Sequence, residues 1–353
     1  MSLAEMVGSV LMFGIRGGTM GDPETRADVD MLRGLKVRGV ILFDHDIAGA
    51  HPRNIYDPKQ LTKFIAGLRN ELGEDLIVAI DQEGGRVARL REDRGFLPTV
   101  SAAEFGSWER IDQEQYADRQ ARQLAQLGID LNFAPCVDLA LEPDSPVIAG
   151  KGRSFGVDPA HVAHCAQIVV DAHTRHGVRC CLKHFPGHGS ALLDSHNDMC
   201  DITRTHRDAE TEVYRTLLGA NGDSVAVMCG HLVDRNIDPR LPATLSEQHV
   251  QGVLRGKLGF DGVVVTDSLD MRAIRDHFGE GEAAALALAG GCDLVLDGIN
   301  APGYREPGAP VRIANAIAEA IGQGRIPDAE TRLAAARARI DSWGGRFMRR
   351  ATD

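Results

Sequence analysis

Residues 263–271, VVVTDSLDM, carry the pattern that decides the fold of this chain. Four apolar or β-branched residues, Val263–Thr266, run without interruption and end at the carboxylate of Asp267. A short, continuously apolar run is typical of a parallel strand that is covered on both faces. Seven other short runs predict strands in the same way, at Val10–Phe13, Val40–Phe43, Leu76–Ile80, Asp130–Phe133, Arg179–Lys183, Val225–Cys229 and Asp293–Leu296.

Amphipathic patterns fill the gaps between these runs. They predict helices at Pro58–Leu72, Asp112–Leu127, Pro159–His176, Ser246–Lys257 and Gly281–Ala289. Eight strands that alternate with helices predict an α/β fold, a single and somewhat irregular (β/α)8 TIM-type barrel over residues 1–345. The segment after Asn300 predicts C-terminal packing helices, and residues 346–353 are expected to form a short tail.

A doubly wound open sheet is the alternative architecture for the same order of elements. Such sheets that bind dinucleotides carry G-x-G-x-x-G after the first strand. The turn at 14–22, GIRGGTMGD, has a different spacing. The barrel is therefore the favoured prediction.

Composition excludes several classes of protein. The 353 residues carry a formal net charge of −11, which argues against a nucleic-acid partner because such partners need clustered Lys and Arg. Seven scattered cysteines without a C-x-x-C pair predict buried, reduced thiols. The N-terminal run lacks a basic segment before it and is interpreted as a first strand, and no run reaches the roughly 18 apolar residues of a membrane span. We expect a cytoplasmic protein with no membrane partner.

Polar side chains follow the predicted strands at their carboxyl ends, where the site of a barrel enzyme is built. Each has a simpler interpretation: Asp267 as a helix N-cap, for example, or Asp81 as a solvated acid in a turn. Together they place acids, cations and histidines at one rim, a set that suits attack on sugars and binding of their hydroxyl groups. In chain order they are Asp81, Glu83, Arg86, Asn132, Asp138, Lys183, His184, His231 and Asp267.

The stretch at 183–198, KHFPGHGSALLDSHND, has two interpretations. A metal site would use its histidines with Asp194, but their spacing matches no zinc pattern. An acid–base loop would use the rigid strand end for binding and the Gly-containing part for movement. We favour the acid–base loop and expect no metal.

Six blocks of the chain resemble glycoside hydrolase family 3, within it the single-domain bacterial β-N-acetylglucosaminidases. The blocks are GVILF (39–43), IDQEGGRVARL (80–90), LNFAPCVD (131–138), GRSFG (152–156), KHFPGHG with DSH (183–196) and LRGKLGFDGVVVTDSLDM (254–271). The last block matches the family's active-site signature at each constrained position. Two neighbouring positions depart from the usual Asp-Leu-Ser after the nucleophile, since Ser268 and Asp270 stand there.

The resemblance implies roles for individual residues. Asp267 would be the nucleophile that forms a covalent glycosyl-enzyme, and His196, oriented by Asp194, would be the general acid and base. His188 and His231 have two interpretations each, contact with substrate or packing. The residues that hold the sugar would be Asp81, Arg89, Arg153, Lys183 and His184. No cofactor is implied.

The resemblance also implies the reaction: a retaining exo-β-N-acetylglucosaminidase that removes terminal N-acetylglucosamine from cell-wall muropeptides or related fragments, in peptidoglycan recycling. The substrate expected is a small carbohydrate, and the resemblance specifies no oligomeric state. The alternatives are a β-glucosidase or a phosphorolytic β-hexosaminidase of the same family, and a non-catalytic sugar-binding barrel from a different class. Retained Asp267, Asp194 and His196 argue against the last of these.

Overall fold

A computed structural model describes residues 1–47, 49, 51–192, 199–302 and 306–347. Eight parallel strands form one sheet in the order β11-β9-β7-β6-β5-β2-β1-β12. A bridge between Val265 and Leu294 joins β11 to β12, so the sheet closes on itself as a barrel. The predicted (β/α)8 barrel is confirmed. The strands are β1 (Leu11–Gly14), β2 (Gly39–Leu42), β5 (Ile77–Ile80), β6 (Leu131–Asn132), β7 (Arg179–Phe185), β9 (Ala226–Cys229), β11 (Val264–Thr266) and β12 (Val295–Asp297).

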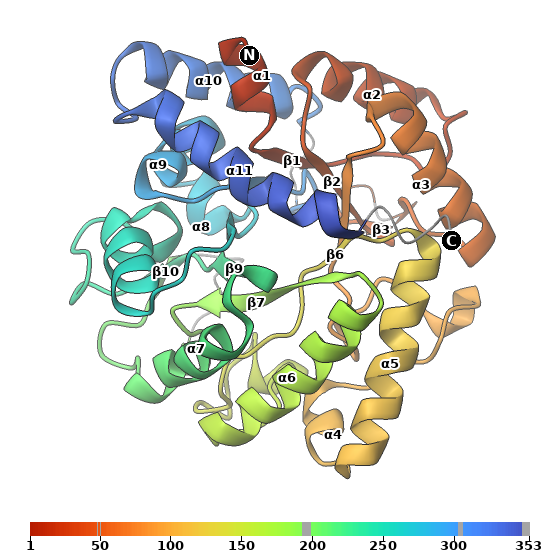
Figure 1. Ribbon diagram of the computed structural model, residues 1–353, viewed down its shortest axis with the longest axis vertical. Helices are drawn as coiled ribbons and strands as arrows, with labels where there is room; N and C mark the ends of the chain where they lie inside the picture. Colours follow the sequence, from red (N-terminus) through yellow and green to blue (C-terminus); the bar gives the residue numbers. More distant parts are fainter. Residues whose placement is uncertain (48, 50, 193–198, 303–305, 348–353) are drawn as a thin grey trace.

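Helices surround the barrel on its outer face (Figure 1). The predicted helix at 58–72 is confirmed at both ends, and the four others agree within two residues. Ser246, the first residue of one predicted helix, lies before the observed helix and accepts a hydrogen bond from the amide of His249 (3.2 Å). The helices are α1 (Leu3–Gly8), α2 (Pro23–Leu35), α3 (Pro58–Leu72), α4 (Ala102–Gly106), α5 (Arg110–Leu127), α6 (Pro159–Arg175), α7 (Asp208–Asn221), the π-helical η5 (Gln248–Lys257), α8 (Arg272–Arg275), α9 (Glu280–Gly290), α10 (Ala309–Gly322) and α11 (Ala329–Phe347), with short 3-10 turns at Glu92–Arg94, Ala149–Lys151, Gly222–Ser224 and Ala243–Leu245.

The N-terminal segment was predicted as a strand only, but it contains helix α1 followed by strand β1. Ser2 and Glu5 form a capping box there: the Ser2 side chain accepts from the Glu5 amide (3.3 Å), and the Glu5 carboxylate accepts from the Ser2 amide (2.7 Å). Those two bonds satisfy amides that the first turn of a helix leaves unpaired. The apolar run therefore serves both a short helix and the strand after it.

Helix α11 lies across the end of the barrel where the strands begin (Figure 1). Its Arg339 pairs with Asp293 (3.0 Å), just before β12, and its Asp341 pairs with Arg38 (3.1 Å), just before β2. The predicted packing of C-terminal helices on the barrel is confirmed. The carboxyl ends of the strands remain open on the opposite side.

Two small pairs of strands decorate the loops at the carboxyl ends. An antiparallel hairpin follows β2, formed by β3 (His45–Asp46) and β4 (His51–Pro52). A parallel pair joins the loops after β7 and β9, formed by β8 (Cys200–Asp201) and β10 (Leu232–Val233). Both pairs give the loops at this end of the barrel fixed positions.

The core fills the barrel and the layer between strands and helices with aliphatic side chains, and all seven cysteines are buried, as predicted. Among the described residues, no helix combines the length and apolar character required to cross a membrane.

Candidate active site

A pocket of about 490 Å³ opens at the carboxyl ends of the strands. This is the location that the (β/α)8 fold favours for a site. The pocket brings together the expected nucleophile and all five expected sugar-binding residues, which come from four different strand ends. They are Asp81, Arg89, Arg153, Lys183, His184 and Asp267.

Opposite charges alternate along one wall of this pocket. The Lys183 ammonium contacts Asp81 Oδ1 (2.8 Å) and Glu83 Oε1 (2.7 Å). Arg153 makes a two-pronged contact with Glu83, from Nε to Oε2 (2.8 Å) and from Nη2 to Oε1 (2.7 Å). Arg89 reaches Asp81 Oδ2 at 3.5 Å. We call Asp81, Lys183, Glu83 and Arg153 the charged row.

The charged row keeps its members ionised. Burial opposes the charge on Asp81 and Glu83, but the neighbouring cations outweigh it and lower the pKa of both carboxyl groups. Burial likewise opposes the charge on Lys183, and Asp81 and Glu83 outweigh it and raise the pKa of the ammonium. The side chains of Lys183 and Glu83 are only 3% and 4% exposed, so water screens these pairs little. The wall therefore presents fixed donors and acceptors to a bound molecule.

His184 extends the charged row toward a buried carboxylate. Its Nδ1 lies 2.7 Å from Asp138 Oδ2, and its Nε2 lies 3.2 Å from Arg153 Nη2. Arginine can only donate, so Nε2 accepts and the proton sits on Nδ1. Asp138 also accepts the amides of His184 and His188. Asp138 thus fixes both the tautomer and the orientation of His184.

Asp267 stands directly after β11, where one hydrogen bond holds its backbone and another holds its carboxylate. Its amide donates to the carbonyl of Cys229 on the neighbouring strand (3.0 Å), and its Oδ1 accepts the amide of Ser268 (2.8 Å). The side chain is half-buried and lines the pocket. A carboxylate held at a strand end in this way has the fixed geometry that a nucleophile requires.

The two histidines with open interpretations lie behind the pocket wall. His188 packs edge-on against the His184 ring, with 5.8 Å between ring centres, and burial lowers the pKa of His188 to about 4. The His231 ring is fully buried, with Nε2 at 2.9 Å from the carbonyl of Ser268. Neither belongs to the pocket lining. The expected acid–base residues, Asp194 and His196, lie outside the described residues.

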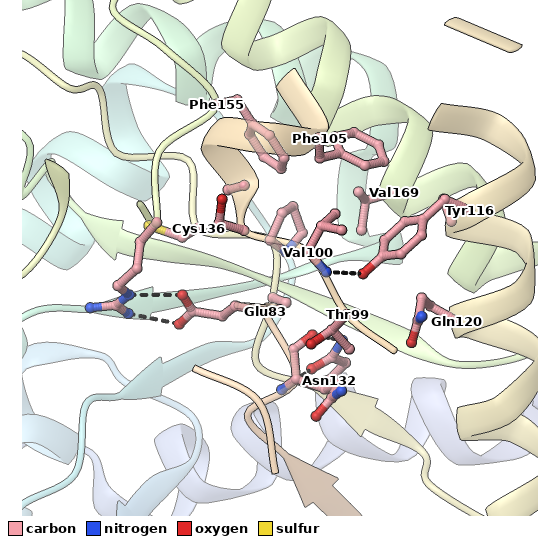
Figure 2. Close-up of a pocket in the computed structure, with 18 of the residues that line it drawn as sticks. Glu83, Thr99, Val100, Phe105, Tyr116, Gln120, Asn132, Cys136, Phe155 and Val169 are labelled. Atoms are coloured by element: carbon pink, nitrogen blue, oxygen red, sulfur yellow. Dashed lines mark hydrogen bonds and ion pairs between the residues drawn. The ribbon is translucent and has the colours of Figure 1, made fainter. Parts of the chain in front are cut away.

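A second, smaller cavity of about 50 Å³ lies behind the charged row (Figure 2). Glu83 stands at its boundary, with its carboxylate engaged by the guanidinium of Arg153. Phe105, Tyr116 and Phe155 form an apolar wall of the same cavity. The side chains of Arg153 and Glu83 are 6% and 4% exposed, so bulk solvent screens this pair little.

The described residues contain one group of side chains with metal-ligand atoms close together: Cys136, Asp138 and His184, within 4.8 Å of one another. These atoms already hydrogen-bond among themselves, from the Cys136 thiol to Asp138 (3.2 Å) and from the His184 ring to Asp138 (2.7 Å). Burial raises the pKa of the Cys136 thiol well above its usual range, so it retains its proton. The three side chains thus form a hydrogen-bonding network.

Glu83 and Asp138 are recognisable from sequence as polar residues at strand ends, but the local pattern indicates no role for either. Glu83 links Lys183 and Arg153, which lie 100 and 70 positions further along the chain, and such partners cannot be read from local patterns. The spacing of Glu83 and Asp81 could have indicated that Glu83 belongs to the site. The two residues are two positions apart, and in an extended chain this spacing directs both side chains to one side.

The two residues that depart from the family pattern prove to be in contact. The hydroxyl of Ser268 donates to Asp270 Oδ1 at 2.6 Å. The family pattern has an acid and a serine at these two positions in the opposite order, so the chain retains both residue types as a hydrogen-bonded pair.

Comparisons with known proteins agree with this geometry. The model of the family described as "Glycosyl hydrolase family 3 N terminal domain" matches residues 5–342. The beta-hexosaminidase of Xylella fastidiosa (strain M23) is 34% identical over 301 residues, 81% of this chain and 82% of that protein. The beta-hexosaminidase of Tolumonas auensis is 35% identical over 290 residues, 81% of each chain.

Solved structures show the same fold. The β-N-acetylhexosaminidase of Beutenbergia cavernae superposes with a TM-score of 0.83 at 28% identity, over 98% of this chain and 99% of that one. The family 3 β-N-acetylglucosaminidase of Paenibacillus sp. str. FPU-7 gives a TM-score of 0.84 at 31% identity over 97% of this chain, which spans 62% of that longer protein. Motifs, barrel, pocket and relatives lead to one conclusion: this chain belongs to glycoside hydrolase family 3.

Proposed function

We propose that this protein is a retaining exo-β-N-acetylglucosaminidase with Asp267 as its nucleophile. The observation that carries the proposal is the position of Asp267, fixed at the end of β11 in the same pocket as the charged row and His184. Relatives named beta-hexosaminidase support the choice of an N-acetylated sugar.

In the proposed mechanism, the charged row, Arg89 and His184 hold the terminal sugar. Asp267 attacks the anomeric carbon while the glycosidic oxygen leaves with a proton, which produces a glycosyl-aspartate ester. Water, deprotonated by the same acid–base group, then attacks the anomeric carbon and releases the sugar with retained configuration. The imidazole of His196 is the proposed proton carrier, with Asp194 as the partner that orients it.

The finer parts of the proposal concern substrate and place. The substrate is a small carbohydrate, a terminal N-acetylglucosamine on a cell-wall muropeptide or related fragment. The proposed location is the cytoplasm, where the enzyme would act in peptidoglycan recycling. One catalytic domain over residues 1–345 would carry the whole reaction.

Hydrolysis of an aryl β-N-acetylglucosaminide and of the matching β-glucoside tests the proposal. We expect the wild type to prefer the N-acetylated substrate and Asp267→Asn to lose kcat by about 10³-fold or more, because the amide cannot form the covalent ester. Mass spectrometry of protein treated with a 5-fluoro glycosyl fluoride should find the sugar on Asp267. Equal activity of wild type and Asp267→Asn would refute the mechanism.

The same assay separates the alternatives. Preference for the glucoside would favour a β-glucosidase, and release of sugar 1-phosphate in phosphate buffer would favour a phosphorolytic enzyme. His196→Ala should lose activity most strongly on substrates with poor leaving groups, since these need the proton most.

A further inference from the structure

The joint between β11 and β12 is built differently from an ordinary parallel pair. In such a pair, backbone amides donate to backbone carbonyls. Such bonds are present here in the direction from β11 to β12, from the Thr266 amide to the Leu294 carbonyl (3.0 Å) and from the Leu269 amide to the Leu296 carbonyl (3.0 Å). In the other direction, the amides of alternate residues in and after β12 donate to side chains: Leu296 to Thr266 Oγ1 (2.9 Å), Gly298 to Ser268 Oγ (2.8 Å) and Asn300 to Asp270 Oδ2 (2.6 Å). We call Thr266, Ser268 and Asp270 the side-chain ladder.

Asp270 is the member of the side-chain ladder with the most hydrogen bonds. Its Oδ2 accepts the amides of Asn300 and Ala301 (2.6 and 2.9 Å), and its Oδ1 accepts the hydroxyl of Ser268 (2.6 Å). The residue is 3% exposed. A buried carboxylate with three donors has one orientation, so it locks the loop after β11 to the loop after β12.

Ser268 connects this lock to Asp267. Its hydroxyl belongs to the side-chain ladder, while its amide donates to Asp267 Oδ1 (2.8 Å). His231 holds the same residue from another side, through the Ser268 carbonyl (2.9 Å). The amide that orients the carboxylate of Asp267 is therefore placed by the side-chain ladder and by His231.

The lock also reaches the far wall of the pocket. The side chain of Asn300 accepts the amide of Ile47 (3.0 Å) and donates to the carbonyl of His45 (3.1 Å), both in the hairpin after β2. His45, Ile47 and Asn300 line the same pocket as Asp267. One set of hydrogen bonds thus spans three of the loops that form the pocket.

We infer that Asp270 is a positioning residue for Asp267, acting through Ser268 and the side-chain ladder. The inference rests on the proposed function, in which Asp267 is the nucleophile. It assigns to Asp270 a contribution to kcat rather than to sugar affinity, because the charged row and His184 hold the sugar on other strands.

The test compares Asp270→Asn with Asp293→Asn. The amide at 270 cannot accept all three donors, so kcat should fall by about tenfold or more while KM changes by less than about twofold. Asp293 is a matched control: it is buried, its Oδ2 accepts the Val264 amide (2.8 Å) and pairs with Arg255 (2.7 Å), and it lies at the opposite end of the same joint. We expect Asp293→Asn to lower the melting temperature and leave kcat within about twofold of wild type.

A second readout is the rate at which the 5-fluoro glycosyl fluoride labels Asp267. The labelling rate should fall in Asp270→Asn by the same factor as kcat. In Ser268→Ala the labelling rate should also fall, by a smaller factor. Normal kcat and labelling in folded Asp270→Asn, or an equal loss in Asp293→Asn, would overturn the inference while the proposed function stands. A wild type that is neither active nor labelled would overturn the proposed function, and the inference with it.

Discussion

At the scale of single residues, Glu83 is the centre of the charged row. Both oxygens of its carboxylate are engaged by Arg153, and one also contacts Lys183. Removing one partner of a buried ion pair leaves the other charges uncompensated, which costs more than the pair itself contributes. Two cations that bind the sugar in the proposed mechanism therefore depend on an acid that was not assigned a role from sequence.

Glu83→Gln should lower both stability and activity. We expect a loss of roughly 3 kcal/mol in the free energy of unfolding, since Arg153 then lies buried without a counter-charge and Lys183 keeps only that of Asp81. The loss in kcat/KM should be about 100-fold, because both cations shift relative to the sugar. Urea unfolding and steady-state kinetics measure the two effects. Glu92→Gln, at an exposed acid after the same strand, is the control, and a Glu83→Gln enzyme that matches it would contradict the assigned role.

At the scale of elements, sequence patterns located strands and helices well but not their partners. The run at 263–266 predicted β11 because buried parallel strands exclude polar residues. Helix α1 was missed, because its two turns share the apolar run of β1 and its capping box spans only Ser2 to Glu5. The hairpin after β2 has strands of only two residues, too short for any periodic pattern.

Helix α7 anchors the loop after β7 through Glu210, a second long-range contact that local patterns could not reveal. Its carboxylate accepts the amides of Gly189 (2.8 Å) and Ser190 (3.2 Å) and the hydroxyl of Ser190 (2.8 Å). Glu210 also accepts the amide of Arg207 at the start of its own helix (3.2 Å). One buried side chain thus joins a helix terminus to the turn after β7.

Glu210→Gln should loosen that turn, since an amide presents a donor where the carboxylate had an acceptor. We expect the amides of Gly189 and Ser190 to exchange with deuterium about tenfold faster or more, while helix α7 keeps its protection. Hydrogen-exchange mass spectrometry of peptides covering 187–191 provides the measurement. Glu212→Gln, exposed on the same helix, should leave the exchange unchanged. Unaltered exchange in both variants would argue against the anchor.

At the scale of the whole molecule, the barrel and the location of its site followed from sequence because alternation of strands and helices admits few architectures. The charged row did not, since its members lie on strands that only the closed barrel brings together. Burial of ionisable groups is another property of the whole fold. His249 is fully buried, and burial lowers its pKa from 6.5 to about 4 despite the opposing carboxylates Asp234 and Asp238.

His249 should make the protein less stable in mild acid. Between pH 6.5 and about 4 the unfolded chain binds a proton at this histidine and the folded chain does not, so this group's contribution to stability falls as pH falls. Wild type loses this contribution as the pH falls and His249→Leu does not. The free energy of unfolding of His249→Leu minus that of wild type should therefore increase by about 2–3 kcal/mol from pH 7 to pH 4. Urea unfolding at both pH values tests this. Val250→Ala is the control, since it changes a buried neighbour without a titratable group; its free energy of unfolding should differ from that of wild type by the same amount at pH 7 and at pH 4. A difference between His249→Leu and wild type that does not change with pH would contradict the assignment.

The side-chain ladder has a consequence for how this enzyme evolves. Where strands are joined by backbone amides and carbonyls, almost any sequence can make the joint, and its stiffness is common to all members of a fold. At the joint beside Asp267, three side chains supply acceptors in addition to the backbone carbonyls, so part of the stiffness there depends on the identity of individual residues. If Asp267 acts as proposed, single substitutions at these positions would change the positioning of its carboxylate without altering the barrel, and catalytic rate would diverge among relatives through this joint.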